Sequence, residues 1–129
     1  MLMPIDESLI VQHVDEAAFC RLVAAFYRRV REDDLIGPLY PPDDWAGAEA
    51  RFAGFLCFRF HGNPAYTQSR GHPRLRGRHM PFAIGEAQRD RWLELMGAAM
   101  AETALEPAAA SQLGAFFAQV ADFMRNQPG

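Results

Sequence analysis

The chain has 129 residues, which is enough for one compact domain and short for two. Half of the residues are hydrophobic and ten are Phe, so a large aromatic core can form. The net charge of −3 argues against a nucleic-acid binder, and no apolar run approaches the roughly 18 residues of a membrane helix. Residues 1–11 lack the basic flank and long apolar run of a signal peptide, so we expect a cytoplasmic protein.

Helical periodicity runs through most of the chain and predicts one main domain over residues 15–129, preceded by a segment of residues 1–14 with a short helix. The first long helix begins at Asp15, whose side chain can cap it, and its pattern ends at Gly37-Pro38. The second follows Pro41-Pro42, where an aspartate can cap it, and continues to a Gly-Asn-Pro break.

The second half of the chain is also predicted to be helical. Residues 63–72 form a polar loop, which leads to a short helix from Pro73 to His79. Two long helices are expected over residues 86–104 and from Pro107 onward. Because β-branched residues are few and never alternate with polar ones, the predicted fold class is all-α.

The cysteines and the basic residues indicate which kinds of binding site the chain can form. Cys20 and Cys57 belong to no metal-binding or disulfide motif, so both are expected to be buried thiols. All 13 basic residues are Arg, and residues 51–85 hold six of them with no acidic residue. This segment is predicted to be a cationic patch that faces a small anion.

The short helix of residues 73–79 indicates a bound group that is not protein. Its inward face offers only Leu75 and His79, which is little apolar surface for packing on a core. A single histidine is more often a core or surface residue than a ligand, but the carbonyls freed by Pro81 could accept its Nδ1–H. Two flanking arginines would suit the carboxylates of a haem, whereas a zinc site would lack further ligands nearby.

Flat, bulky side chains are concentrated in the predicted helices, including Phe26, Tyr27, Phe52, Phe55 and Trp92. In most helical domains such a set is ordinary core. Beside a haem ligand, the same side chains would line a flat ring.

Four segments of the chain together resemble the truncated haemoglobins, and within them the group II members. They are residues 71–82 (GHPRLRGRHMPF), residues 89–93 (RDRWL), the pair Phe26-Tyr27 and residues 40–49 (YPPDDWAGAE). They follow one another in family order, and the similarity covers roughly residues 15–125. Two departures concern loops, because glycine pairs of the family are replaced by QHV at residues 12–14 and reduced to HGN at residues 61–63.

The resemblance implies a truncated globin fold, a two-over-two helical sandwich enclosing one haem b (iron protoporphyrin IX). His79 takes the position of the proximal iron ligand, while Tyr27 and Trp92 take polar distal positions. The residues that would contact the haem are Phe26, Tyr40, Phe52, Phe55, Leu56, Tyr66, Leu75, Arg78, Phe82 and Met96. Among these, Tyr40 would add a third distal hydroxyl, and Arg78 and Tyr66 would meet the propionates.

The implied function is binding of O₂, and of other diatomic ligands such as NO and CO, with slow O₂ release. Donors at Tyr27 and Trp92 would stabilise negative charge on the bound ligand. Slow release favours a sensor, or an enzyme such as an NO dioxygenase or a peroxidase served by an unidentified reductase, over an oxygen carrier. The alternative from another class is a haem-free helical interaction module. A homo-oligomer is compatible with the sequence.

Overall fold

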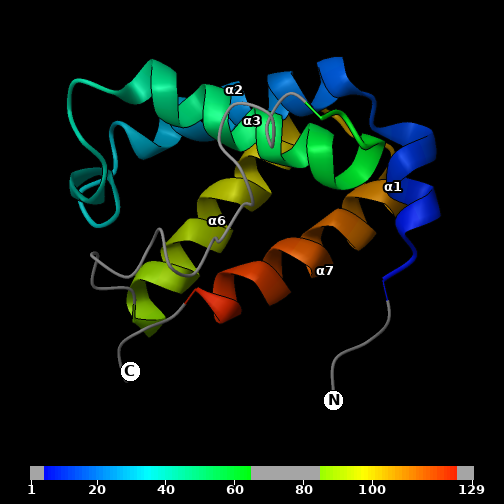
Figure 1. Cartoon of the computed structure of the whole chain (residues 1–129). Coiled ribbons are helices and arrows are strands. Elements are labelled where there is room, and N and C mark those ends of the chain that lie inside the picture. Colours follow the sequence, from blue (N-terminus) through cyan, green and yellow to red (C-terminus); the bar gives the residue numbers. More distant parts are fainter. Residues whose placement is uncertain (1–4, 65–84, 125–129) are drawn as a thin grey trace.

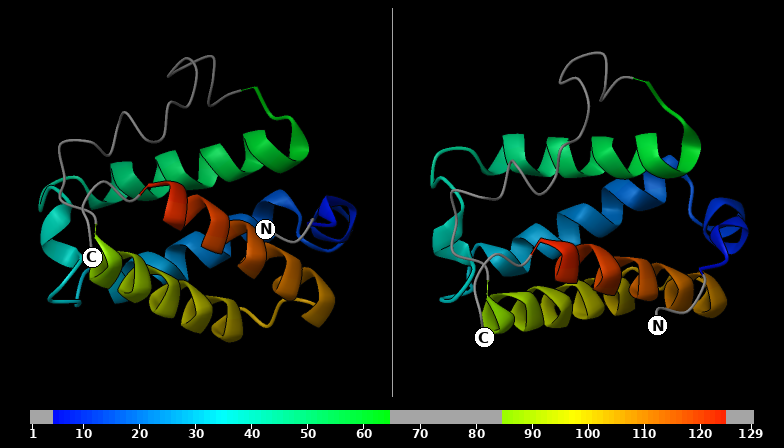
Figure 2. Two further views of the ribbon diagram at one scale, coloured as in Figure 1. Left: turned by 90° about the horizontal axis from the view of Figure 1, so that it is seen from below. Right: turned by 60° about the horizontal axis from the view of Figure 1, so that its bottom comes forward.

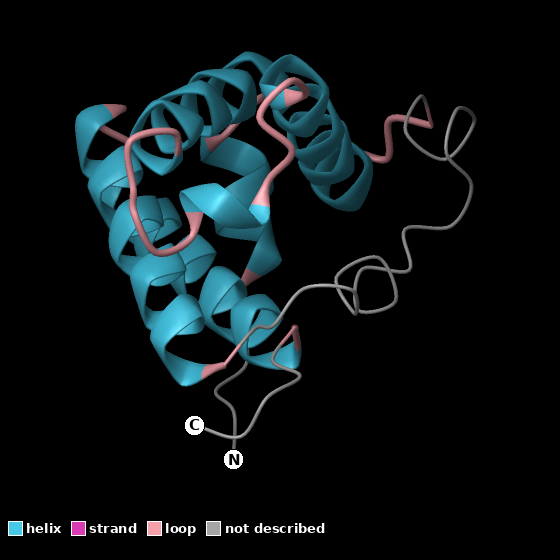
Figure 3. Cartoon of the chain, turned by 90° about the vertical axis from the view of Figure 1, so that its left-hand side faces the viewer, coloured by secondary structure: helices cyan, strands magenta, loops and turns pink. Residues whose placement is uncertain are grey.

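The structure is a computed structural model that describes residues 5–64 and 85–124 of the chain. Within these two ranges all regular structure is helical, which confirms the all-α class, and Figure 3 shows helices joined by short loops. The elements are α1 (Glu7–His13), α2 (Glu16–Val30), the 3-10 turn η1 (Gly37–Leu39), α3 (Trp45–His61), α6 (Glu86–Glu102) and α7 (Pro107–Phe123).

The helices form two layers of two. Figure 1 shows α2 and α3 in one layer and α6 and α7 in the other, and α1 stays at one end of both layers in the turned views of Figure 2. Helix α2 is central because it packs against both α3 and α6, while α6 also packs against α7. Helix α1 covers one end of the two layers by packing against α7 and α3.

The long helices begin and end at residues with a clear physical role. The Ala18 N–H donates to the carboxylate of Asp15 at 2.8 Å, which caps α2 as expected. Pro107 occupies the first turn of α7, and the Ala109 N–H donates to the Glu106 carboxylate at 2.8 Å. Gly62 ends α3 with a φ of 68°, a left-handed conformation that glycine adopts without steric cost.

The start of α3 is held by an ion pair rather than by a cap. Asp44 stands at the cap position, but its carboxylate binds the Arg51 guanidinium at 2.7 Å and caps no backbone N–H of the first turn. A Cβ atom on Gly47 would lie 2.1 Å from Asp44 Oδ1 and 2.8 Å from Arg51 Nη1. Glycine at position 47 therefore leaves room for this ion pair to close over the helix.

The core follows the stripes that the helical spacing predicts. Six side chains of α2 have no exposed surface: Phe19, Leu22, Val23, Ala25, Phe26 and Val30. On the opposing layer, α6 contributes Met96 and Ala99, and α7 contributes Leu113, Phe116 and Phe117. Burying aromatic and aliphatic surface from both layers is the main stabilising contribution expected for such a sandwich.

The prediction of a cationic patch is wrong for Arg51 and Arg59, the two arginines of this segment that the structure describes. Arg51 pairs with Asp44, and Arg59 binds both carboxylate oxygens of Glu7 at 2.8 Å. The acidic partners come from outside residues 51–85, so the local excess of arginine in the sequence is neutralised in the fold. The other four arginines of the segment lie outside the described residues.

The prediction of two buried thiols is correct for Cys57 and wrong for Cys20, which is exposed. Cys20 follows the buried Phe19 on α2, and a step of one residue turns a helical side chain about 100° away from the core. Burial raises the pKa of the Cys57 thiol to about 11.

Gly37 fits tightly against the end of α2. A Cβ atom at this position would lie 2.7 Å from the Val30 carbonyl oxygen, a backbone atom that cannot move without moving the helix. We expect Gly37→Ala to lower the free energy of unfolding by about 1–3 kcal/mol, measured by urea denaturation. The matched control is Gly97→Ala, where a Cβ atom would meet nothing within 4 Å and the helix should gain stability. Equal effects of the two changes would contradict this account of Gly37.

Candidate functional site

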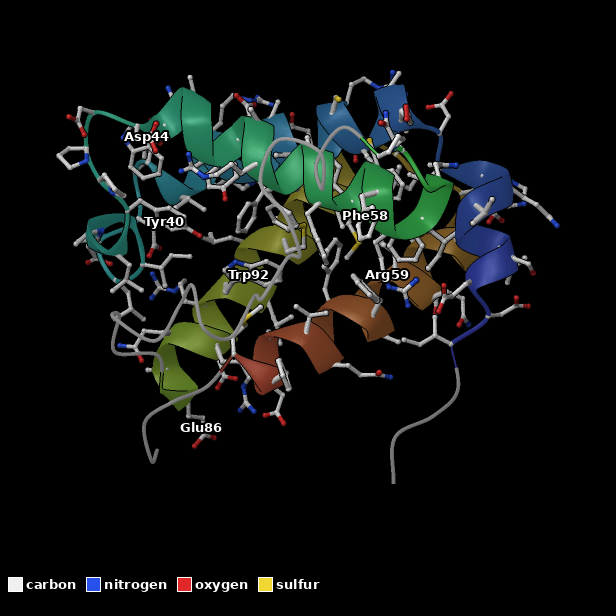
Figure 4. All side chains as sticks on the ribbon, in the orientation of Figure 1. Tyr40, Asp44, Phe58, Arg59, Glu86 and Trp92 are labelled. Atoms are coloured by element: carbon white, nitrogen blue, oxygen red, sulfur yellow. The ribbon has the colours of Figure 1, made fainter. Side chains whose placement is uncertain are left out.

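A cluster of aromatic side chains lies where α2, α3 and α6 meet. Phe26 and Tyr27 come from α2, Phe52 from α3 and Trp92 from α6, while Tyr40 precedes α3. Figure 4 labels Tyr40 and Trp92, which lie at the same end of the fold, one beyond η1 and the other on α6. The two-layer packing thus gathers residues that are up to 66 positions apart (92 − 26).

The rings of this cluster contact one another mostly edge to face. The ring centroid of Phe26 lies 5.1 Å from that of Tyr27 and 5.0 Å from that of Trp92. Tyr27 and Tyr40 are 5.5 Å apart, and Phe52 and Trp92 are 6.0 Å apart. Such contacts fix the orientation of each ring beyond what burial alone achieves.

The polar atoms of the cluster are neutral hydrogen-bond donors in apolar surroundings. Burial raises the pKa of Tyr27 well above its usual value, and the nearby Tyr40 hydroxyl adds to the rise. Burial also raises the pKa of Tyr40, although hydrogen bonding of the Tyr27 hydroxyl and the Trp92 indole to its oxygen partly offsets this effect. Both phenols therefore keep their protons at neutral pH and can act as hydrogen-bond donors, although the Tyr27 hydroxyl would have to leave the Tyr40 oxygen to reach a ligand.

The structure brings together five of the predicted site residues and places three others in the shared core. The five are the members of the aromatic cluster described above. Phe55, Leu56 and Met96 belong to the same continuous hydrophobic core and are 8%, 0% and 1% exposed. The remaining predictions, Tyr66, Leu75, Arg78, His79 and Phe82, lie outside the described residues.

Two aromatic neighbours of the site are not among the residues predicted from the sequence. Trp45 lies 5.4 Å from Tyr40 and 6.3 Å from Tyr27 between ring centroids, and the Arg31 guanidinium stands over its ring at 5.7 Å. Phe117 of α7 lies 5.6 Å from Trp92. Helical spacing marks both residues as ordinary members of an apolar face, and spacing alone cannot show which rings they meet.

An ion pair outside the aromatic cluster is likewise not predicted from the sequence. Arg91 of α6 donates to Asp33 Oδ1 at 2.5 Å, and the Asp33 side chain is only 7% exposed. The second oxygen of Asp33 accepts the backbone N–H of Leu35 at 3.0 Å and that of Ile36 at 2.8 Å. The turn between α2 and η1 is therefore tied both to itself and to α6.

The ionised carboxylate of Asp33 makes the free energy of unfolding depend on pH. Burial raises the pKa of Asp33, but hydrogen bonds from the Ile36 N–H, Arg91 and the Leu35 N–H outweigh it and hold the pKa below its usual value. The stabilisation is therefore complete above the unfolded-state pKa and is lost as pH falls through the lower folded-state pKa. We expect the difference in unfolding free energy between the unaltered protein and Asp33→Asn to shrink from pH 6 to pH 3. Urea denaturation at both pH values measures it, and a difference that grows toward pH 3 would contradict the account.

The donor set fits a haem with a small distal ligand better than a metal ion bound by side chains alone. Within residues 5–64 and 85–124 no three His, Cys, Asp or Glu side chains gather into a metal site. His61 is engaged elsewhere, because its Nε2 lies 2.7 Å from the Val14 carbonyl oxygen. Neutral phenol and indole donors held among apolar rings suit a flat hydrophobic cofactor that carries a polar ligand.

Comparison with known proteins decides between these chemistries. A family model described as bacterial-like globin matches residues 14–126. Group 2 truncated hemoglobin YjbI of Bacillus subtilis (strain 168) is 39% identical over 93 residues, which cover 72% of this chain and 70% of that protein. The solved structure of a thermostable hemoglobin from Thermobifida fusca has a TM-score of 0.84 at 41% identity, covering 88% of this chain and 93% of that one.

The chain belongs to the group II truncated haemoglobins. Further relatives agree: the truncated oxygen-avid haemoglobin of Bacillus subtilis has a TM-score of 0.82 at 34% identity, covering 88% of this chain and 95% of that one. Two-on-two hemoglobin-3 of Arabidopsis thaliana is 34% identical over 94 residues, 71% of this chain but only 54% of that protein, so this globin spans about half of the plant chain.

Family membership confirms two predictions made from the sequence. The two-over-two helical sandwich is the fold of the solved truncated haemoglobins that this globin matches. Truncated haemoglobins are haem proteins, so this globin binds small diatomic ligands at haem. None of its described helices is long and apolar enough to cross a membrane.

Proposed function

We propose that this truncated haemoglobin holds haem b through His79, binds O₂ and releases it slowly. Haem supplies a ferrous iron at which a diatomic ligand binds reversibly. The observation that carries the proposal is the set of neutral donors formed by the buried Tyr27 and the partly buried Tyr40 and Trp92. Donors of this kind stabilise a ligand that becomes negatively polarised when it binds.

The surroundings of the donors strengthen their effect. Tyr27 is 5% exposed and contacts Phe26 and Phe52, so little water can compete for its hydroxyl. Trp92 is held between Phe26 and Phe117, which restricts the direction of its indole N–H. A hydrogen bond to a charged acceptor contributes about 1.5–3 kcal/mol, which corresponds to roughly 10- to 150-fold in ligand dissociation.

The remaining cofactor contacts are proposed from the resemblance of residues 71–82 to the family pattern. We propose His79 as the axial ligand because it is followed by Met-Pro-Phe and flanked by arginine in that pattern. Arg78 and Tyr66 would meet the propionates. The ring would lie among Phe26, Tyr40, Phe52, Phe55, Leu56, Leu75, Phe82 and Met96.

Absorption spectra of the purified protein test the proposal. The ferric, ferrous and CO-bound forms should show the Soret bands of a histidine-ligated haem b. His79→Ala should abolish that signature, and added imidazole should restore it by taking the vacated ligand position. His13→Ala, a change on the exposed face of α1, is the control and should leave the spectra unchanged. A protein without a Soret band after haem addition would instead be the haem-free interaction module.

A second candidate function is oxidation of NO to nitrate by the O₂-bound protein. It is favoured by the same donor set, because a protein that releases O₂ slowly is a poor carrier but can hold O₂ until NO arrives. This activity would need a reductase to return the iron to the ferrous state. Rapid mixing of the O₂-bound protein with NO should yield nitrate, and the iron should become ferric far faster than it does in the O₂-bound protein without NO. Absence of nitrate would exclude this function.

A further inference from the structure

Asp33 is the point at which the turn before η1 and helix α6 are joined. Its Oδ2 accepts two backbone N–H groups of the turn, while its Oδ1 accepts the Arg91 guanidinium. Each carboxylate oxygen thus serves a different segment. Since the side chain is almost fully buried, loss of either set of partners would leave carboxylate oxygens without compensation.

The two segments joined by Asp33 carry two of the distal donors. Arg91 immediately precedes Trp92 on α6, so a shift of the Arg91 backbone moves the indole with it. On the other side, Asp33 holds the turn that continues through the buried Ile36 and Gly37 to Tyr40. The link between Asp33 and Arg91 therefore joins the segment that leads to Tyr40 with the turn of α6 that carries Trp92.

Two further carboxylates lie near the Arg91 guanidinium. Asp34 and Glu94 approach its guanidinium at 3.5 Å and 3.4 Å, but their side chains are 96% and 74% exposed. Exposed contacts of this kind contribute little energy because water and salt screen them. The buried carboxylate of Asp33 is the partner that sets the geometry.

We infer that Asp33 and Arg91 are positioning residues that set the separation between Tyr40 and Trp92, and thereby the rate of ligand release. The inference rests on the proposed function of Trp92 as a distal donor. According to this inference, a charged pair outside the haem site controls the positions of the Tyr40 hydroxyl and the Trp92 indole.

The test compares two arginines of the same helix. Arg91→Gln removes the link to Asp33, whereas Arg89→Gln removes ion pairs with Glu86, Asp90 and Asp122, none of which belongs to the aromatic cluster. The chain has two tryptophans, so the ¹⁵N-labelled ferrous CO form should give two indole N–H signals in NMR spectra. Trp92→Phe identifies the signal of Trp92 by removing it.

We expect Arg91→Gln and Asp33→Asn to shift the Trp92 indole signal, to speed its hydrogen exchange and to raise the O₂ dissociation rate about 2- to 10-fold. This range corresponds to weakening one neutral hydrogen bond. The double variant should add little to either single change, because both remove the same link. Arg91→Lys retains the charge and should bring the indole signal and the O₂ dissociation rate part of the way back to those of the unaltered protein. It also serves as the test variant if Arg91→Gln fails to fold.

Two outcomes separate the inference from the proposed function. If Trp92→Phe leaves O₂ dissociation unchanged while Arg91→Gln still shifts the indole signal, the distal role of Trp92 fails, and of the inference only the positioning of the indole by Arg91 stands. If Arg91→Gln leaves the indole signal and the dissociation rate as Arg89→Gln leaves them, the positioning role is overturned, whatever Trp92→Phe shows.

Discussion

Trp92→Phe should release O₂ about 10- to 150-fold faster than the unaltered protein. The change retains a flat ring beside Phe26 and Phe52 but removes the indole N–H, which as a donor to a charged acceptor is worth about 1.5–3 kcal/mol. Stopped-flow displacement of O₂ by CO measures the rate directly.

Trp45→Phe is the matched control for this prediction. Trp45 packs against Tyr40 and Tyr27, and the Arg31 guanidinium stands over its ring. We expect a much smaller change in O₂ release from this variant. Equal effects of the two substitutions would show that general packing, rather than a directed N–H, controls ligand release.

Phe26→Ala should lower the free energy of unfolding by about 3–5 kcal/mol, the cost of removing a large buried aromatic ring. The side chain has no exposed surface and contacts Tyr27, Phe52 and Trp92, so three neighbours lose a packing partner. Urea denaturation of the haem-loaded protein, followed by far-UV circular dichroism, gives the value.

The same substitution at an exposed position provides the comparison. Phe123 is 62% exposed at the end of α7, and Phe123→Ala should change the free energy of unfolding by less than about 0.5 kcal/mol. A loss below about 1 kcal/mol for Phe26→Ala would mean that the aromatic cluster can close over the missing ring.

Most helix ends could be predicted from the sequence because they depend on local chemistry, but the end of α2 could not, since it lies at Val30 and not at the predicted Gly37-Pro38. Asp15 caps the helix that follows it, Pro107 opens α7, and Gly62 ends α3. The buried stripes were also predictable, since a helix of 3.6 residues per turn places residues at intervals of three and four on one face. The resemblance to truncated haemoglobins adds that Tyr27 and Trp92 belong to one site, and in the fold both rings contact Phe26.

The partners of charged and surface side chains could not be predicted in the same way. Arg59 pairs with Glu7, 52 positions earlier, and Arg91 pairs with Asp33, 58 positions earlier. Periodicity shows which face of a helix a residue occupies but not what the opposing segment offers. For this reason the sequence predicts a cationic patch over residues 51–85 and gives no sign of the role of Asp33.

Because one of the two cysteines is exposed and the other is buried, the protein can be labelled selectively at one site. Burial raises the pKa of the Cys57 thiol to about 11, so this thiol stays protonated and unreactive at neutral pH. Cys20 stands exposed on the central helix α2, so a maleimide dye should couple there without any engineered cysteine. Because haem absorbs strongly, the emission of that dye should fall as haem binds, and titration would give the haem affinity of the natural sequence.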